Sequence, residues 1–194
     1  PLLLYLAAAG IGTLGVVDDD VVDLSNLQRQ VIHATSRIGM SKVESAALTV
    51  ADINPDVRLV SHAERLTPEN VMRLIADYDI IADGSDNFDT RFLVNDACHL
   101  AGKTLVSGAI LRFEGQIATF KSHLGNAYPC YRCLYRDPPP PGMIPSCSEG
   151  GVLGALAGSV GSLQATEVLK EVMDIGQSLA GQLILYDALD ATFR

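Results

Sequence analysis

Short apolar runs that alternate with helix-type segments constrain this chain more than any other feature of its sequence. Runs at 13–17, 57–63 and 79–83 predict strands, the first and third of them buried, and helix-type segments lie between and after them. Such alternation favours parallel pairing, so we predict an α/β fold with a Rossmann-like, mostly parallel sheet and helices on both faces. Later strands at 104–110 and 116–120, flanking a turn at Gly115, and at 182–187 predict an antiparallel C-terminal extension.

Helix signals place five helices along the chain. We expect helices at 2–9, at 42–53 with Ser41 as its cap, from Thr67 and Pro68 to just before Tyr78, at 90–100 with Gly102 closing it, and at 163–173. The segment 128–145, with four consecutive prolines, is expected to be a loop without helix, and a glycine-rich stretch at 150–161 leads into the last helix.

The length of 194 residues suits one domain spanning 1–194. The chain starts directly on a helix, so we expect a first strand and its turn to be missing upstream. The formal net charge of -9 disfavours nonspecific nucleic-acid binding, and no apolar run reaches the roughly 20 residues of a membrane span. Four cysteines, two of them in a C-x-x-C, fit a reducing cytoplasm better than a disulfide framework.

Two polar clusters follow the predicted strands at 13–17 and 79–83 and are expected to lie along one edge of the sheet. The first contains Asp18, Asp19, Asp20, Asn26, Arg29 and Gln30, and the second contains Gly84, Ser85, Asp86, Asn87 and Arg91. An acid at the end of a strand in a dinucleotide-type fold can bind ribose hydroxyls, which is one interpretation of Asp18; a surface acid is the other. Arg29 and Lys42 could stabilise a phosphate, and Asp86 could hold the Mg²⁺ of ATP. A surface salt bridge explains a single Arg or Lys more often than catalysis does.

The cysteines divide into three kinds. Cys130 and Cys133 could supply two thiolates to zinc, form a redox pair or have no such role. The redox interpretation is the weaker one because the motif lies in a proline-rich loop and is not expected at a helix start after a strand. Cys147 is a candidate nucleophile or a small buried thiol, and Cys98 is expected in the core. The four histidines lack metal-ligand spacing and receive no role.

Several segments of the chain, in this order, resemble the MoeB/ThiF family, relatives of the ubiquitin-activating enzymes. The matching segments are DDDVVDLSNLQRQ at 18–30, G-x-x-K at 39–42, INP at 53–55, DGSDNF at 83–88, PCYRC at 129–133 and PSC at 145–147. The resemblance implies an adenylyltransferase that uses ATP to activate the C-terminal Gly-Gly carboxylate of a ubiquitin-like sulfur-carrier protein, releasing pyrophosphate. The expected carrier is the molybdopterin synthase small subunit, in molybdenum cofactor biosynthesis, or a similar thiocarboxylate carrier.

The resemblance also implies roles for individual residues. Asp18 lies near the ribose, Asp86 positions magnesium, and Cys130 and Cys133 bind zinc together with two later thiolates. Cys147 is a possible covalent thiol, and a homodimer is expected. The residues implied in nucleotide binding are Asp18, Asp20, Ser25, Asn26, Arg29, Lys42, Asp86 and Asn87, of which Arg29, Lys42 and Asp86 are implied in catalysis.

Three parts of the family pattern are expected outside this sequence: the glycine-rich G-x-G-G-x-G turn before Pro1, the second C-x-x-C after Arg194, and an arginine from the partner subunit. The domain is therefore expected to be incomplete at both ends. Thiamine-pathway and tRNA-thiolation adenylyltransferases share nearly the same residues, and some relatives carry a rhodanese domain. An NAD-dependent oxidoreductase and a non-catalytic scaffold are the alternatives from other classes.

Overall fold

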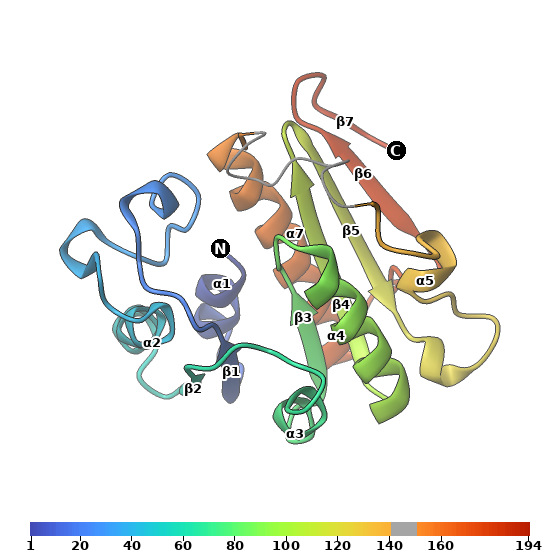
Figure 1. Ribbon diagram of the computed structural model, residues 1–194, viewed down its shortest axis with the longest axis horizontal. Coiled ribbons are helices and arrows are strands. Elements are labelled where there is room, and N and C mark those ends of the chain that lie inside the picture. The colour runs from blue at the N-terminus through green and yellow to red at the C-terminus, as the bar shows by residue number, and fades with distance from the viewer. Residues whose placement is uncertain (141–150) are drawn as a thin grey trace. The chain divides into compact units, whose positions relative to one another are not determined.

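The computed structural model describes residues 1–140 and 151–194, and the chain divides into two compact units (Figure 1). Pro1–Leu66 contains a two-stranded parallel sheet, and Thr67–Arg194 contains a five-stranded mixed sheet. A single domain over 1–194 stays a prediction. Within the described part of the chain, no helix is both long and apolar enough to cross a membrane.

The first unit consists of helical segments around the parallel pair β1–β2, which runs in register from Thr13 beside Arg58 to Val17 beside His62. Its elements are α1 (Leu2–Ala8), β1 (Thr13–Val17), η1 (Leu24–Asn26), η2 (Thr35–Arg37), α2 (Lys42–Ile53) and β2 (Arg58–His62). The predicted boundaries of β1 and α2 are confirmed. The prediction that β1 is buried is wrong, because Leu14 is its one buried residue.

Helix α2 provides much of the packing of the first unit. Its side chains Val43, Ala46 and Val50 are almost completely buried. At its end, Asn54 Nδ2 donates a hydrogen bond of 3.0 Å to the carbonyl oxygen of Ala7 in α1. Ser41 occupies the N-cap position, as predicted, but its side chain makes no capping hydrogen bond within the described residues.

The second unit is built on a sheet with strand order β3-β4-β5-β6-β7. Strands β3 and β4 pair in parallel, and the remaining neighbours pair antiparallel, which confirms the α/β class and the antiparallel C-terminal extension. Its elements are α3 (Val71–Ile75), β3 (Ile80–Asp83), α4 (Phe88–Ala101), β4 (Thr104–Leu111), β5 (Glu114–Phe120), η3 (Ser122–Leu124), α5 (Tyr131–Leu134), α7 (Gly154–Met173), β6 (Leu183–Asp187) and β7 (Thr192–Phe193).

Helices α4 and α7 cover opposite faces of this sheet, with α4 in front and α7 behind β3 to β5 (Figure 1). Ile117, Leu156 and Val160 form a buried apolar cluster between β5 and α7. Gly115 lies inside β5, where a Cβ atom would come within 2.4 Å of Val160 Cγ2. The prediction of a turn at Gly115 is therefore wrong: this position lacks a side chain because α7 packs directly on the strand, and the reversal lies at 112–113.

Two predicted helix starts are also wrong, and one helix was not predicted. Thr67 does not begin a helix, because its backbone N–H donates to Asn70 Oδ1 and α3 starts only at Val71. Helix α7 starts at Gly154 and not at residue 163, so much of the glycine-rich stretch is helical. The segment predicted to be loop contains the short helix α5, which is anchored by the buried ring of Tyr131.

Candidate active site

The carboxylates that follow β1 form a compact cluster with one lysine. Lys42 Nζ lies 2.7 Å from Asp20 Oδ2 and 3.5 Å from Asp18 Oδ2. Asp18 Oδ1 also accepts a hydrogen bond of 2.9 Å from the backbone N–H of Asp20, which turns the chain at the end of the strand. The sequence-predicted residues Asp18, Asp20 and Lys42 are thus brought together, although Lys42 follows Asp20 by 22 positions.

This cluster combines negatively charged carboxylates with a positively charged lysine, and the two kinds of group could contact different parts of a nucleotide. One carboxylate oxygen from each of Asp18, Asp19 and Asp20 lies within 4.8 Å of the others, an arrangement that could hold a cation. Carboxylates also accept hydrogen bonds from ribose hydroxyls, and the ammonium group of a lysine can neutralise a phosphate.

A second group of predicted residues surrounds η1. Asp23, which the sequence did not single out, caps this helix: its Oδ1 accepts from Ser25 N–H at 2.8 Å and from Ser25 Oγ at 2.6 Å. These hydrogen bonds lower the pKa of Asp23. Asn26 Oδ1 accepts from Asp23 N–H at 3.2 Å, and Arg29 Nη1 donates to the carbonyl oxygen of Ser25 at 3.0 Å. The hydrogen bonds of Ser25 and Asn26 therefore stabilise the loop that carries Arg29.

His33 lies near this site and was missed by the sequence analysis. Its Nδ1 lies 2.9 Å from the hydroxyl oxygen of Ser45, a fully buried residue of α2. Partial burial lowers the pKa of His33, and the positive charge of Lys42 lowers it further. No spacing rule could find this histidine, because its partners come from a helix that begins nine positions later.

The loop between β3 and α4 carries Asp86 and Asn87, both exposed. Asn87 Oδ1 accepts from the backbone N–H of Thr90 at 2.8 Å, so this side chain caps α4. Asp86 presents an exposed carboxylate on a four-residue loop, which suits an oxygen ligand for Mg²⁺. Asp86 belongs to the second unit and Lys42 to the first, so their convergence on one nucleotide stays a prediction.

The two cysteines of the C-x-x-C face each other, with 3.7 Å between their Sγ atoms. Two thiolates bound to one tetrahedral zinc at about 2.3 Å are separated by about 3.8 Å, so the pair fits half of a zinc site. The expectation that this motif does not lie at a helix start is wrong, because Cys130 is the N-cap of α5.

Of the other two cysteines, the structure describes Cys98. Cys98 is buried in α4, and its burial raises the pKa of its thiol to about 12, which confirms the predicted core position. Cys147 lies outside the described residues.

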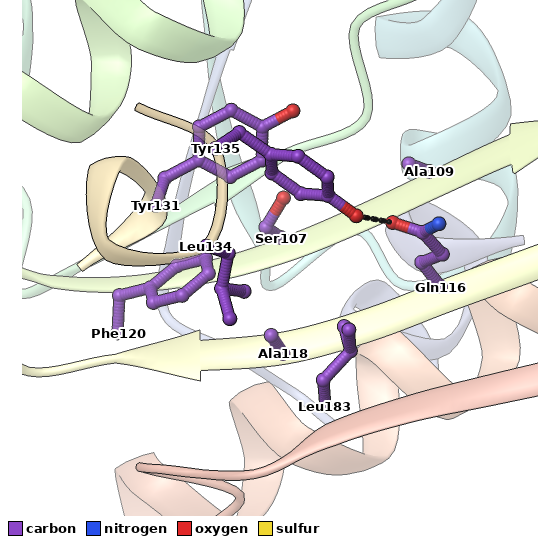
Figure 2. Close-up of a pocket in the computed structure, with 9 residues that line it drawn as sticks. All are labelled: Ser107, Ala109, Gln116, Ala118, Phe120, Tyr131, Leu134, Tyr135 and Leu183. Carbon is purple, nitrogen blue, oxygen red and sulfur yellow. Dashed lines mark hydrogen bonds between the residues drawn. The ribbon is translucent and has the colours of Figure 1, made fainter. Parts of the chain in front are cut away.

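A small cavity lies between α5 and the face of β4, β5 and β6 (Figure 2). Tyr131 and Tyr135 cover it, and Tyr135 Oη donates a hydrogen bond of 3.0 Å to Gln116 Oε1. Its volume of about 10 Å³ has room for roughly one water molecule. The cavity contains none of the predicted site residues and is too small for a nucleotide.

The fold and the clusters at the strand ends define a mixed α/β protein whose polar groups could bind a nucleotide at the carboxyl ends of the strands. The chain belongs to the ThiF family, whose model matches residues 1–194. The family resemblance stated from the sequence is thereby confirmed.

Two relatives show how far the similarity extends. The chain is 54% identical over 195 residues to the probable adenylyltransferase/sulfurtransferase MoeZ of Mycobacterium tuberculosis, covering all of this chain and 50% of that protein. It is 52% identical to the sulfur carrier protein adenylyltransferase of Thermus thermophilus, of which it covers 72%. The chain therefore spans half the length of the first relative and most of the second.

Among solved structures, Escherichia coli MccB crystallised with ATP superimposes with a TM-score of 0.85 at 17% identity. The match covers all of this chain and 59% of that protein. At this identity the likeness concerns the fold.

Proposed function

We propose that the full-length protein is an adenylyltransferase that activates the C-terminal Gly-Gly carboxylate of a ubiquitin-like sulfur-carrier protein with ATP. The observation that carries this proposal is the 52% identity to a sulfur carrier protein adenylyltransferase over the whole chain. The cluster of Asp18, Asp20 and Lys42 supports it, because it combines acceptors for ribose with a cation for phosphate.

In the proposed reaction, a carboxylate oxygen of the carrier attacks the α-phosphorus of ATP. The new bond joins this oxygen to phosphorus, the bond from the α-phosphorus to the bridging oxygen breaks, and pyrophosphate leaves with that electron pair. The nucleophile is already an anion and needs no general base, so catalysis consists of placement and charge neutralisation. Lys42 and Arg29 supply positive charge, Asp18 holds the ribose, and Asn26 orients the phosphates.

Asp86 is proposed to hold the magnesium ion that accompanies ATP and reduces the negative charge of the triphosphate. Asp20, Ser25 and Asn87 complete the proposed nucleotide contacts. Ser25 and Asn87 also stabilise the loops that carry Arg29 and Asp86.

Zinc is proposed at Cys130 and Cys133, with a structural role. Their separation of 3.7 Å supports this assignment, since a disulfide would hold the sulfur atoms at about 2.05 Å. Metal analysis of the full-length protein should give one zinc per chain, and the Cys130→Ser variant should lose it. A wild-type protein with substoichiometric zinc would contradict the assignment. We also place the enzyme in the cytoplasm, a reducing compartment in which cysteines stay reduced and available to bind zinc.

The decisive experiment incubates the full-length protein with Mg²⁺·ATP and purified candidate carriers, from the molybdopterin, thiamine and tRNA-thiolation pathways. Mass spectrometry should detect an acyl-adenylate on one carrier and no adduct on a matched carrier that lacks its terminal Gly-Gly. Failure with every carrier, together with NAD reduction by a small alcohol, would overturn the proposal.

A homodimer is also proposed, and sedimentation of the full-length protein should give twice the chain mass.

A further inference from the structure

The loop that carries Asp86 is held in place by side chains to which the proposed reaction assigns no role. It spans only residues 84–87, between the end of β3 and the start of α4. Asp83 Oδ1 accepts a hydrogen bond from Ser85 N–H at 2.9 Å. The carbonyl oxygen of Ser85 accepts two from Arg91, at 2.8 Å from Nη2 and 3.3 Å from Nε. The loop is thus fixed immediately before Asp86.

Asp83 is an unusual residue for such a task because it is a buried acid, with 5% of its surface exposed. Burial raises its pKa, while the N–H of Ser85 and the charge of Arg91 act in the opposite direction. A carboxylate removed from water costs free energy unless its hydrogen bonds are satisfied. The N–H of Ser85 supplies such a hydrogen bond to this buried carboxyl group at the last residue of β3.

Gln164 of α7 holds the same strand end from a distant part of the sequence. This side chain is 3% exposed, and its Nε2 donates to the carbonyl oxygens of Asp83 at 2.8 Å and Val106 at 2.9 Å. One amide group therefore joins neighbouring strands β3 and β4 where the loop leaves the sheet. The amide fits closely: a Cβ atom on Gly108 would come within 2.9 Å of Gln164 Oε1.

We infer that Asp83 and Gln164 are positioning residues for Asp86, which fix the 84–87 loop so that the Asp86 carboxylate is held ready for a divalent cation with ATP. This inference rests on the proposed function of Asp86. Neither residue is proposed to contact the nucleotide, since both are buried. Residues that orient a metal ligand typically change metal affinity or activity by about 10–100-fold when they are removed.

Two pairs of variants in the full-length protein test the inference. Asp83→Ala removes the acceptor for Ser85 N–H, whereas Asp83→Asn keeps an oxygen acceptor and removes the charge. Gly108→Ala pushes against the Gln164 amide without removing a polar group. Its control is Gly158→Ala, on α7, where a Cβ atom would meet nothing within 4 Å.

Two readouts are needed. The first is the Mg²⁺ concentration for half-maximal ATP–pyrophosphate exchange, and the second is Mn²⁺ binding in the presence of ATP, followed by electron paramagnetic resonance. Asp83→Ala should weaken both on the order of tenfold. Gly108→Ala should shift both in the same direction, Asp83→Asn should recover most of the loss, and Gly158→Ala should match the wild type.

The outcomes separate this inference from the proposed function. If wild-type protein exchanges pyrophosphate but Asp83→Ala and Gly108→Ala keep wild-type Mg²⁺ and Mn²⁺ dependence, the positioning role is wrong and the function stands. An Asp83→Asn variant as impaired as Asp83→Ala would assign the effect to charge and overturn the inference. If exchange is absent with every carrier but Mn²⁺ binding responds as expected, the function fails and the positioning role stands. Should Asp83→Ala not fold, Gly108→Ala against Gly158→Ala decides.

Discussion

Replacing Lys42 with methionine should lower the rate of pyrophosphate exchange about 10²–10³-fold while leaving the stability of the fold almost unchanged. The acidic partners of Lys42, Asp18 and Asp20, have side chains that are 33% and 69% exposed. Ion pairs with partners this exposed contribute about 0–1 kcal/mol. Methionine also retains the unbranched apolar stem of the lysine, whose side chain is 11% exposed. The free energy of unfolding should therefore fall by less than about 1 kcal/mol.

The effect of the same substitution on catalysis should be much larger. Lys42 is proposed to neutralise charge that develops on the phosphates, and loss of one such group typically lowers the rate about 10²–10³-fold, or about 2.7–4 kcal/mol. The assay measures ATP–pyrophosphate exchange with the cognate carrier, together with urea unfolding of the same preparations.

Lys121→Met is the matched control because it removes a lysine with the opposite consequence. Lys121 Nζ lies 2.5 Å from Glu171 Oε2, and the Glu171 side chain is only 8% exposed. Without the lysine, this buried carboxylate keeps the hydrogen bond from Ser178 Oγ. Stability should fall by about 1–3 kcal/mol while exchange per folded molecule stays at the wild-type value. Near-wild-type exchange in Lys42→Met, or a loss of stability equal to that of Lys121→Met, would contradict the proposed role of Lys42.

Three further predictions follow from the site and the fold. Asp86→Ala should abolish exchange without lowering the melting temperature, because its carboxylate is exposed; undiminished exchange would remove Asp86 from the metal role. Gly115→Ala should lower the free energy of urea unfolding by about 1–3 kcal/mol through the clash with Val160, whereas Gly158→Ala, which lies in open space, should not. The lowered pKa of His33 means that its contribution to stability is present above the unfolded value of about 6.5 and is lost as pH falls below it. His33→Gln should therefore flatten part of the stability loss between about pH 7 and 5, and an unchanged profile would contradict this.

Local patterns predicted the elements whose formation depends on near neighbours in the chain. The strand at 13–17 and the helix at 42–53 have the predicted boundaries, and Gly102 ends α4 in the left-handed conformation with φ of 69°. A helix stop of this kind depends on the backbone of one residue, so the sequence reveals it.

Predictions failed where a distant segment decides the structure. Gly115 was interpreted as a turn residue, but its requirement comes from Val160, 45 positions later, packing on the strand. The helix at 131–134 depends on Tyr131, whose ring meets Phe92 and Phe120 edge-on and whose N–H donates to Asn95. None of these partners is visible in a local window.

The family and the proposed nucleotide residues could be predicted from the sequence because they lie in motifs of a few adjacent positions. The α/β class could be predicted because strand-type and helix-type segments alternate along the chain. The tertiary structure decided that Lys42 meets Asp18 and Asp20, that His33 lies near them, and that Asp83 and Gln164 hold the loop before Asp86. These contacts join residues that are far apart in the sequence. The hydrogen bond from Gln164 to Asp83, for example, spans 81 positions and forms only when the folded chain brings a helix against the end of a strand.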